Sequence, residues 1–165
     1  MTSDEALAEK IRSLKEHGQS KRYMHRYVGI NGRLDAIQAA VLNVKLKYFP
    51  DEVAKRATIG ERYTQLIADR FIAPVVKEDR THVYAQYSIR VPNREKMIQK
   101  LNDLGVPTAI HYPMPLYRQE VFMPLKIDEK AFPVTEMVSD EIMSLPMSPF
   151  LNEAQQDAVV KALLS

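Results

Sequence analysis

The chain has no cysteine and only 5 glycines among its 165 residues. The absence of cysteine excludes disulfide bonds, thiol catalysis and cysteine-ligated zinc sites. The glycines form neither GxGxxG nor GxxxxGK, so the chain carries no dinucleotide-binding or P-loop fingerprint. No apolar run is long enough to cross a membrane, and the N-terminus is acidic and amphipathic, unlike a signal peptide. These absences predict a cytoplasmic protein.

The charge balance is nearly even, with 23 basic and 21 acidic residues and a net charge of +2. This excess is too small to indicate nucleic acid or an anionic membrane as a partner. Residues 19–28 do interleave basic and aromatic side chains, a pattern that occurs in nucleic-acid binding. The patch is isolated, however, and a loop that contacts a phosphorylated small molecule or a partner subunit fits it as well. Considered alone, His25 in this segment is expected to be a structural hydrogen-bonding residue.

Residues 29–35 are the most informative stretch, because two glycines surround Asn31 just before a strongly apolar helical pattern. Apolar residues from Leu34 to Tyr48 cover most sides of that helix, which predicts burial in a core or between subunits. Free N–H groups and the dipole at a helix N-terminus attract anions. Asn31 and Arg33 are therefore candidates to bind a phosphate. The alternative is that Asn31 only caps the helix and Arg33 is a solvated first-turn residue.

The first 70 residues are predicted to form a helical arm. Thr2 and Glu5 form a capping box for an opening helix, and Gly18 suits its C-cap. Pro50 suits the first position of a further helix. The two long helices that meet at this proline are expected to make a kinked arm or a hairpin.

The period changes to two over residues 82–91, which is typical of a half-buried strand. Residues 72–76 are expected to be its hairpin partner. The further elements expected are a helix capped by Asn93 and closed by Gly105, a strand at 106–112, a helix at 133–142, a strand at 143–147, and a final helix capped by Asn152 and Gln155, with Val159, Val160, Leu163 and Leu164 inward. This order predicts an α+β body over residues 71–165, with a mainly antiparallel sheet packed with helices on one face.

Strand 106–112 leads into a loop that prolines at 113 and 115 stiffen, which holds His111 and Tyr112 at the strand end. Strand ends that feed loops are common places for binding groups. An imidazole and a phenol can bind phosphate oxygens or sugar hydroxyls. The alternative is a rigid loop with Tyr112 in the core and His111 exposed.

Four sequence blocks follow one another along the chain: Gly29-x-Asn31-x-Arg33-Leu34-Asp35-x-x-Gln38-Ala39-Ala40, Val83-Tyr84-Ala85-Gln86-Tyr87-Ser88-Ile89, Thr108-Ala109-Ile110-His111-Tyr112-Pro113-x-Pro115-Leu116 and Ser144-Leu145-Pro146-Met147-x-Pro149. In this order and spacing they resemble the DegT-type nucleotide-sugar aminotransferases, pyridoxal phosphate (PLP) enzymes of the aspartate-aminotransferase fold. The resemblance covers almost the whole chain. It is closest to members that aminate UDP-linked 3-keto sugars for bacterial surface polysaccharides, usually with glutamate as the amino donor.

The resemblance implies the small C-terminal domain of a fold-type I PLP enzyme, preceded by a long helical arm. In that family a large α/β domain comes first and carries the lysine that binds the cofactor covalently, which the chemistry requires. No lysine here lies in the small-residue turn that this role needs. The resemblance therefore implies a truncated chain that is inactive alone, contains no catalytic residue and does not bind PLP by itself. The missing large domain and a second copy of the chain are the implied partners.

The resemblance also assigns roles to single residues. It implies that Asn31 hydrogen-bonds the PLP phosphate bound mainly by the neighbouring subunit of a homodimer. Arg33 would face the diphosphate of the substrate, for which a fixed fork of donors is well suited. His25 would lie near the same opening, and His111 and Tyr112 would contact the nucleotide-sugar.

One position departs from the family pattern. Tyr117 stands where the family often has a second histidine, so we leave it outside the predicted site. No metal ligands are predicted. The alternative function is a stand-alone binding or regulatory module of the same fold that performs no catalysis.

Overall fold

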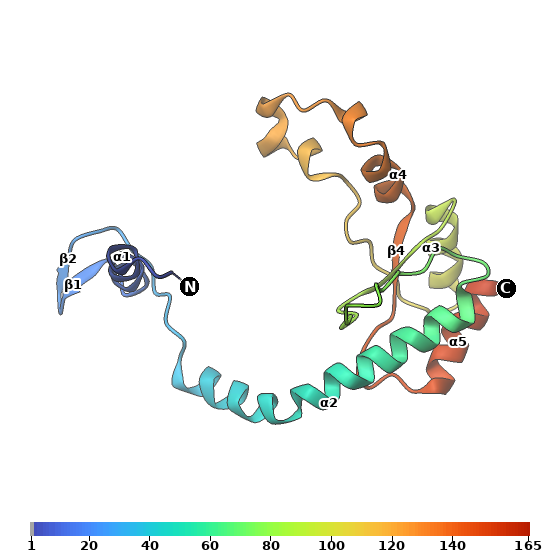
Figure 1. The fold of residues 1–165 in the computed structure, drawn as a ribbon, viewed down its shortest axis with the longest axis horizontal. Coiled ribbons are helices and arrows are strands. Elements are labelled where there is room, and N and C mark those ends of the chain that lie inside the picture. Colours follow the sequence, from blue (N-terminus) through green and yellow to red (C-terminus); the bar gives the residue numbers. More distant parts are fainter. Residues whose placement is uncertain (1) are drawn as a thin grey trace. The chain divides into compact units, whose positions relative to one another are not determined.

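The computed structural model describes residues 2–165 and contains two compact units, one extending to Phe49 and the other spanning Pro50–Ser165. Helices and small antiparallel sheets make up both units, so the predicted α+β class is confirmed (Figure 1). The division at Phe49 lies before the predicted end of the helical arm at residue 70. The arm and body remain a prediction, because a compact unit need not be a domain that folds independently.

The first unit opens with helix α1 (Glu5–Lys15), followed by a hairpin of two short antiparallel strands, β1 (Gln19–Lys21) and β2 (Met24–His25). The expected capping box of Thr2 and Glu5 is wrong. Asp4 is the N-cap, and its side chain accepts a hydrogen bond from the backbone N–H of Leu7 at 3.0 Å. An aspartate directly before the helix satisfies that N–H without help from Thr2.

Helix α2 (Ala36–Ile67) runs without interruption through Pro50, so the predicted hairpin at this proline is wrong. A proline inside a helix removes one hydrogen bond, here to the carbonyl of Leu46, while the turns on either side keep theirs. The first turns of α2 are not buried within the described chain. Ile37, for example, is 81% exposed and Val41 54% exposed, so burial in a core of this chain is wrong and burial between chains stays a prediction.

The sheet of the second unit consists of strand β3 (Tyr87–Arg90) paired antiparallel with β4 (Ile142–Leu145). Two single bridges widen it, Ile72 to Arg90 on one side and Ala109 to Ser144 on the other. The expected strands at 72–76 and 106–112 are therefore reduced to one paired residue each. The mainly antiparallel character of the sheet is as predicted.

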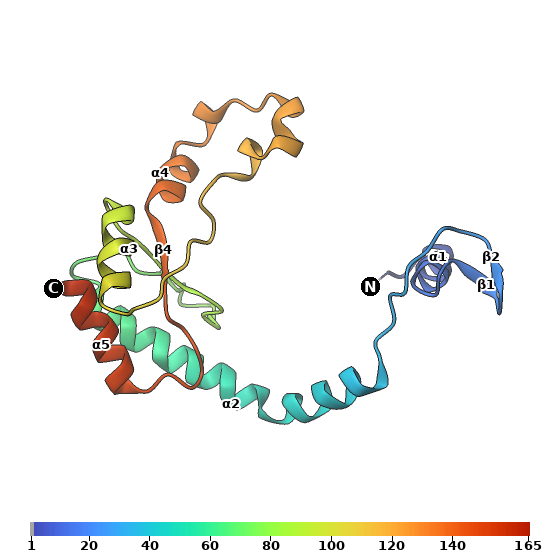
Figure 2. The ribbon, with the colours of Figure 1, turned by 180° about the vertical axis from the view of Figure 1, so that it is seen from behind.

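Three helices complete the second unit: α3 (Arg94–Asp103), α4 (Pro133–Glu141) and α5 (Glu153–Leu164). Short 3-10 turns η1 (Leu116–Arg118), η2 (Glu120–Leu125) and η3 (Glu129–Ala131) precede α4. The turned view shows α5 beside the later turns of α2 (Figure 2). A hydrogen bond of 2.9 Å from the Gln156 amide to the Ile59 carbonyl joins these two helices. Across residues 2–165, no helix combines the length and hydropathy that a bilayer crossing requires.

Helix caps show where local sequence is a reliable guide. The capping box of Asn152 and Gln155 is confirmed, since each side chain bonds the other's backbone. Asn93 does precede α3, but it has a positive φ of 56° and its side chain makes no capping hydrogen bond. Leu164, expected to point inward, is 45% exposed because α5 ends there.

Three tyrosines hold the later turns of α2 against the sheet. Tyr63 and Tyr87 are fully buried with ring centroids 5.0 Å apart, and Tyr84 lies 5.7 Å from Tyr87. The hydroxyls of Thr64 and Tyr87 share a hydrogen bond of 2.7 Å. Gly60 lies under the Tyr84 ring so closely that a Cβ there would stand 2.4 Å from a ring carbon. Only glycine allows this contact.

We expect Gly60→Ala to destabilise the chain, although alanine ordinarily favours a helix interior over glycine by about 1 kcal/mol. The clash with the buried Tyr84 ring outweighs that gain, since overpacking a core costs about 1–3 kcal/mol. Urea unfolding should show the loss in free energy of unfolding. The control Thr58→Ala changes an exposed position of the same helix and should stay within about 0.5 kcal/mol. A stabilised Gly60→Ala variant would contradict the packing.

The tyrosines also predict an alkaline limit of stability. Burial raises the pKa of Tyr87 from 10.0 to about 12, against a smaller lowering by its hydrogen bond with Thr64, and burial also raises the pKa of Tyr63 and Tyr84. The native state thus favours neutral phenols, so their contribution is complete below pH 10 and is lost as the pH rises through about 12. Urea midpoints measured from pH 8 upwards should fall in this window. Tyr87→Phe should flatten the fall and Tyr23→Phe, at an exposed ring, should not; equal slopes would refute the assignment.

Candidate functional site

The end of α1 is the anchor for the residues that the sequence selects in the first unit. His17 and Gly18 both have positive φ values, 61° and 76°, and the N–H of Gly18 bonds the carbonyl of Ser13 at 2.8 Å. This pattern closes a helix in a Schellman-type turn. The predicted C-cap at Gly18 is therefore shifted, because the left-handed residue that ends the helix is His17.

Residues 30–32 run alongside this helix end and satisfy its free carbonyls. The N–H of Ile30 donates to the Leu14 carbonyl at 2.9 Å, and that of Gly32 donates to the Lys15 carbonyl at 2.8 Å. The N–H of His17 donates in return to the Ile30 carbonyl at 2.9 Å. These bonds take up groups that a helix terminus leaves unpaired, and they hold the intervening Asn31 in place.

Gly29 permits this close approach. A Cβ at residue 29 would lie 2.2 Å from the nitrogen of Gly18 and 2.5 Å from the carbonyl oxygen of Leu14. Both neighbours are backbone atoms, which cannot turn aside as a flexible side chain can. The glycine that the sequence marks as conformationally free is therefore needed here for lack of space.

Three predicted site residues come together around residues 16 and 17. Nδ1 of His25 lies 2.9 Å from the His17 carbonyl and must donate to it, since a carbonyl only accepts. Nη1 of Arg33 donates to Oε2 of Glu16 at 3.0 Å. Asn31 pairs its backbone with Glu16.

Asn31 does not act as the cap of α2, and Arg33 is not a residue of its first turn, so both parts of the expected alternative are wrong. Helix α2 begins at Ala36, and the amide oxygen of Gln38 accepts from the N–H of Asp35, so Asn31 does not cap it. Arg33 likewise precedes the helix and is ion-paired. The hypothesis that Asn31 and Arg33 stand at the N-terminus of α2 is also corrected, because they lie against the C-terminal end of α1 instead.

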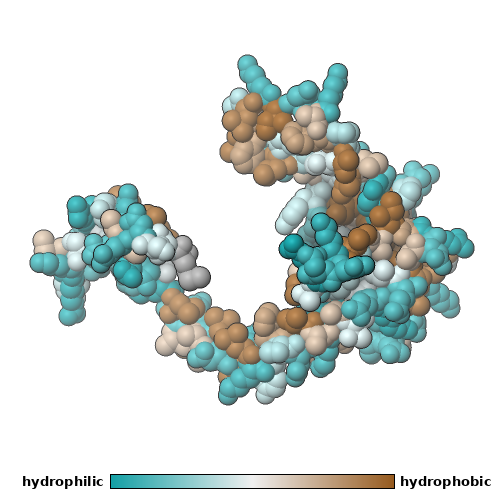
Figure 3. Space-filling view, viewed as in Figure 1, coloured by the Kyte–Doolittle hydropathy of each residue, from teal (hydrophilic) through white to brown (hydrophobic). Residues whose placement is uncertain are grey.

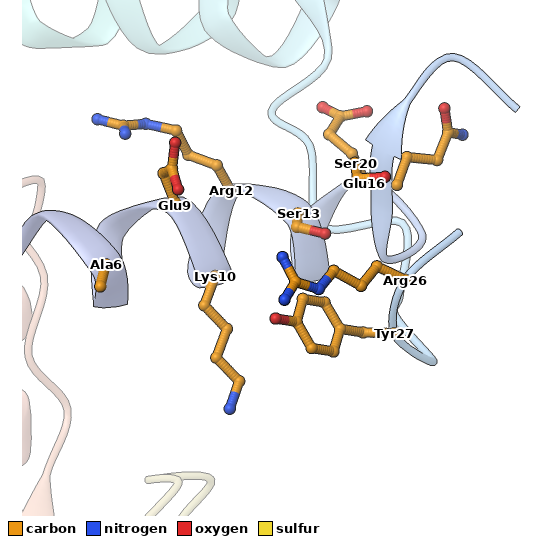
Figure 4. A pocket seen from close by; sticks show the side chains of 10 residues that line it. Ala6, Glu9, Lys10, Arg12, Ser13, Glu16, Ser20, Arg26 and Tyr27 are labelled. Carbon is orange, nitrogen blue, oxygen red and sulfur yellow. The ribbon is translucent and has the colours of Figure 1, made fainter. Parts of the chain in front are cut away.

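The basic and aromatic residues of segment 19–28 pair with one another. The guanidinium of Arg22 lies 5.0 Å from the ring centroid of Tyr23. The guanidinium of Arg26 and the ammonium of Lys10, a residue of α1, lie 5.5 and 5.7 Å from the ring centroid of Tyr27. Figure 4 shows Arg26, Lys10 and Tyr27 on one side of α1, bordering an open pocket. These cations lie near the tyrosine rings of the same chain, and Tyr23 remains 75% exposed.

The second unit places His111 at the edge of the sheet. The bridge between Ala109 and Ser144 fixes the strand end, with the N–H of Ser144 donating to the Ala109 carbonyl at 2.7 Å. Nδ1 of His111 lies 3.0 Å from Oγ of Ser144. Oγ of Ser144 in turn lies 2.8 Å from Oγ of Ser88. A row of hydroxyls therefore runs from β3 through β4 to the imidazole.

Tyr112 does not enter the core. Its side chain is 74% exposed, and its ring meets the His111 ring edge-on with centroids 5.8 Å apart. The expected alternative of a core Tyr112 with an exposed His111 is thus wrong, because Tyr112 is exposed and His111 is half-buried. Both residues line a hollow of about 360 Å³ against α4, and His111 also lines a second one of about 260 Å³. The two side chains therefore border the same hollow.

Sequence reasoning missed Ser88 and Ser144 as parts of this group. The alternation over residues 82–91 did place Ser88 on the more polar face of its strand, the only available signal. Ser144 belongs to a block that we considered only for its resemblance. The sequence does not indicate that these side chains meet. Ser88 and Ser144 lie 56 positions apart, and Ser144 and His111 lie 33 positions apart.

Tyr117, left outside the site, belongs to a cluster that ties the 3-10 turns to α4. Its hydroxyl donates to Glu136, and Arg118 bridges Glu129 at 2.9 Å and Glu136 at 2.7 Å. Desolvation, then the bond to Glu136, raises the pKa of Tyr117 to about 12. These contacts give Tyr117 a structural role. Among residues 2–165, no group of three or more histidine, aspartate or glutamate side chains could hold a metal ion.

Known proteins match this chain over almost its whole length. The model of the DegT/DnrJ/EryC1/StrS aminotransferase family matches residues 1–164. The UDP-2-acetamido-2-deoxy-3-oxo-D-glucuronate aminotransferase of Pseudomonas aeruginosa is 42% identical over 164 residues, which cover 98% of this chain and 45% of that protein. The chain therefore spans less than half the length of this relative.

Solved structures agree. A DegT DnrJ EryC1 StrS aminotransferase from Brucella abortus superimposes with a TM-score of 0.87 at 36% identity, covering 99% of this chain and 44% of that one. NtdA from Bacillus subtilis, with bound cofactor PMP, superimposes with a TM-score of 0.82 at 26% identity, covering 99% of this chain and 40% of that one.

The contacts of Gly29 predict unequal effects of alanine at the two loop glycines. Gly29→Ala should push residues 30–32 away from α1, because its Cβ would meet backbone atoms at 2.2 Å, whereas a Cβ at Gly32 would first meet the Lys15 side chain at 3.2 Å. Amide hydrogen exchange of Ile30 and residue 32 should accelerate at least tenfold in Gly29→Ala and little in Gly32→Ala. Equal protection in both variants would contradict the arrangement.

Proposed function

Because the chain belongs to the DegT/DnrJ/EryC1/StrS aminotransferase family, as its four blocks predict, we propose that it is the C-terminal part of a sugar aminotransferase. The enzyme transfers an amino group, from glutamate, to a nucleotide-linked ketosugar in bacterial surface polysaccharide biosynthesis. Pyridoxal phosphate is the cofactor of the family. The observation that carries the proposal is the match over 164 residues to an enzyme named for a UDP-linked 3-oxo sugar.

The donors around residues 16 and 17 suit an anionic group. Within the described chain the Asn31 amide has no hydrogen-bond partner and is exposed to solvent. Arg33 is partly exposed and pairs one nitrogen, Nη1, with Glu16. An exposed ion pair of this kind contributes about 0–1 kcal/mol, so a phosphate can compete for the guanidinium at little cost. We assign Asn31 to the PLP phosphate and Arg33 to the diphosphate of the substrate.

His25 belongs to the same opening as a substrate-binding residue. Its Nδ1 is committed to the His17 carbonyl, which leaves Nε2 as the ring nitrogen available to a ligand. In the neutral ring that nitrogen accepts a hydrogen bond, and in the protonated ring it donates one to a phosphate oxygen. The residue therefore offers a contact that depends on its protonation state.

In the second unit, His111 and Tyr112 are assigned to the nucleotide-sugar. An imidazole held at a strand end and an exposed phenol beside it offer a nitrogen and a hydroxyl for sugar or phosphate oxygens. The hollow against α4 has apolar walls that include Val134 and Val138. Such walls exclude water around a few directed polar groups, as ligand sites commonly do.

When bound, PLP supplies the electron sink that amino-group exchange requires. The residues described here bind and orient, and none is placed to hold the cofactor covalently. We therefore propose that the chain requires a large domain with the cofactor lysine and that it is inactive alone. We also propose that the enzyme works in the cytoplasm.

A homodimer belongs to the same proposal. Exposed apolar side chains follow the first turns of α2 and are visible as a hydrophobic surface in Figure 3: Leu34, Ile37, Val41, Leu42, Val44, Leu46, Tyr48 and Phe49. A contiguous apolar surface of this kind marks an interface more often than a solvated face. Burial of this surface between two copies would bring the Asn31 loop of one copy to the cofactor of the other.

The test is a chimera in which this chain replaces the matching C-terminal part of the Pseudomonas aeruginosa relative. With PLP, glutamate and UDP-2-acetamido-2-deoxy-3-oxo-D-glucuronate, the chimera should form 2-oxoglutarate, and the 165-residue chain alone should not. Arg33→Lys should lower kcat/KM about 10- to 100-fold, the effect of losing a hydrogen bond to a charged group. Arg22→Lys, at an arginine whose side chain donates to the hydroxyl of the neighbouring Tyr23, should leave kcat/KM unchanged.

A folded, PLP-loaded chimera without activity would overturn the proposal. The alternative, a stand-alone binding module of the same fold, makes a different prediction. In that case the isolated chain would bind UDP-sugar tightly, with no large domain present, in a calorimetric titration.

A further inference from the structure

The hydroxyl pair behind His111 has a defined geometry. Ser88 in β3 and Ser144 in β4 are directly opposite each other in the strand register, and their Oγ atoms lie 2.8 Å apart. Ser144 is only 4% exposed. Its backbone is paired on both sides, with β3 and with Ala109. The side chain of Ser144 therefore has little freedom to turn away from its neighbours.

Each hydroxyl has one proton to donate, and this determines the direction of the row. The structure gives the Ser88 hydroxyl one side-chain partner, Ser144, and gives Ser144 two, Ser88 and Nδ1 of His111. If Nδ1 carried the proton, Ser144 would accept from it, and the Ser88 and Ser144 hydroxyls could then use only one of their two protons within the row. If Ser88 donates to Ser144 and Ser144 donates to Nδ1, both hydroxyl protons have an acceptor, at 2.8 and 3.0 Å. The one proton left over is then the imidazole's own, on Nε2, and His111 borders two hollows where water or a ligand can accept it.

We infer that Ser144, supported by Ser88, is a positioning residue that holds His111 as the tautomer protonated on Nε2. The imidazole then presents a neutral N–H donor to an oxygen of its ligand, and its ring plane is fixed by the bond at Nδ1. Orientation of one ring nitrogen by a bond to the other is a general means of setting a histidine's role.

The inference rests on the proposed function in one respect, namely that the ligand of His111 is the nucleotide-sugar. A neutral donor suits a substrate oxygen that carries partial charge, such as a sugar hydroxyl or a diphosphate oxygen. Tyr112, edge-on to the ring at 5.8 Å between centroids, adds a second polar group on the exposed side. Ser144 is buried and contacts His111 directly, so its proposed effect on the ligand acts through the imidazole.

The test uses the 165-residue chain with its histidines labelled with 15N on the ring. His111→Ala identifies the signals of His111. In the ligand-free wild-type chain, at a pH where the ring is neutral, Nε2 should resonate as a protonated nitrogen and Nδ1 as a hydrogen-bonded acceptor. In Ser144→Ala, Nδ1 loses its donor, so the two shifts should move toward each other as both tautomers become populated. Ser88→Ala should move them in the same direction by less.

The matched control is Ser139→Ala, which removes another buried hydroxyl, one that donates to the Glu136 carbonyl at 2.8 Å. It should leave the His111 shifts unchanged, since its hydroxyl does not contact the ring. Circular dichroism confirms that each variant is folded. If Ser144→Ala fails to fold, the wild-type spectrum still decides, because a proton on Nδ1 would overturn the inference. Identical His111 shifts in wild type and folded Ser144→Ala would also overturn it.

Titration with UDP separates this result from the proposed function. Binding of UDP to the chimera should weaken about 2- to 10-fold in Ser144→Ala and more in His111→Ala, the range expected for one neutral hydrogen bond. Unchanged UDP affinity in His111→Ala, together with unchanged KM for the UDP-linked ketosugar, would reject His111 as a substrate contact while leaving the tautomer assignment intact. A protonated Nδ1 together with weakened UDP binding in His111→Ala would overturn the tautomer assignment and support His111 as a substrate contact.

Discussion

The need to pair every backbone N–H and carbonyl near the end of an element governs the position of each candidate ligand-binding group. In the first unit, residues 30–32 take up the last carbonyls of α1 and thereby hold Asn31 beside Glu16. In the second unit, the single bridge of Ala109 to Ser144 fixes the strand end that carries His111. Two short segments, neither of them a strand of any length, thus orient the polar side chains that matter.

The local sequence predicted features, such as helix caps, that depend on contacts between residues close together in the chain. The box of Asn152 and Gln155 is visible in four residues and occurs as expected. The position of α3 is equally clear, yet the mode of its start is not, because Asn93 adopts a left-handed conformation that its side chain does not announce. Patterns with a helical period identified the helices, although Pro50 does not divide α2, and the two-residue period identified β3 over a longer range than Tyr87–Arg90.

The features that sequence could not reveal depend on partners distant in the chain. Residues 72–76 have the composition of a strand, but only Ile72 forms a bridge, to Arg90, and Pro74 has no N–H with which to extend the ladder. The apolar surface of α2 was readable, while the choice between a core and another chain was not, since both give the same pattern. The row from Ser88 to His111 joins three separate segments, and no single window of sequence contains it.

In the proposed enzyme this chain would supply donors to the ligand, and another part would hold the cofactor covalently; the chain covers 45% of the Pseudomonas aeruginosa relative. Binding groups and reactive group would then reside in different parts of one enzyme. Such a division lets the substrate contacts vary while the chemical centre stays constant. It also means that the specificity of the proposed enzyme for its nucleotide-sugar is encoded partly in residues remote from the reacting atoms.

The contact of Gly60 with the Tyr84 ring has a wider meaning for how this sequence can change. A hydrogen atom at one position and an aromatic ring at the other fill a single volume shared by α2 and the segment before β3. The residue that is tolerated at position 60 therefore depends on the residue at position 84. Drift to a larger residue in the helix becomes tolerable only after the ring has been exchanged for something smaller, so the order of the two steps decides whether a lineage can pass through both.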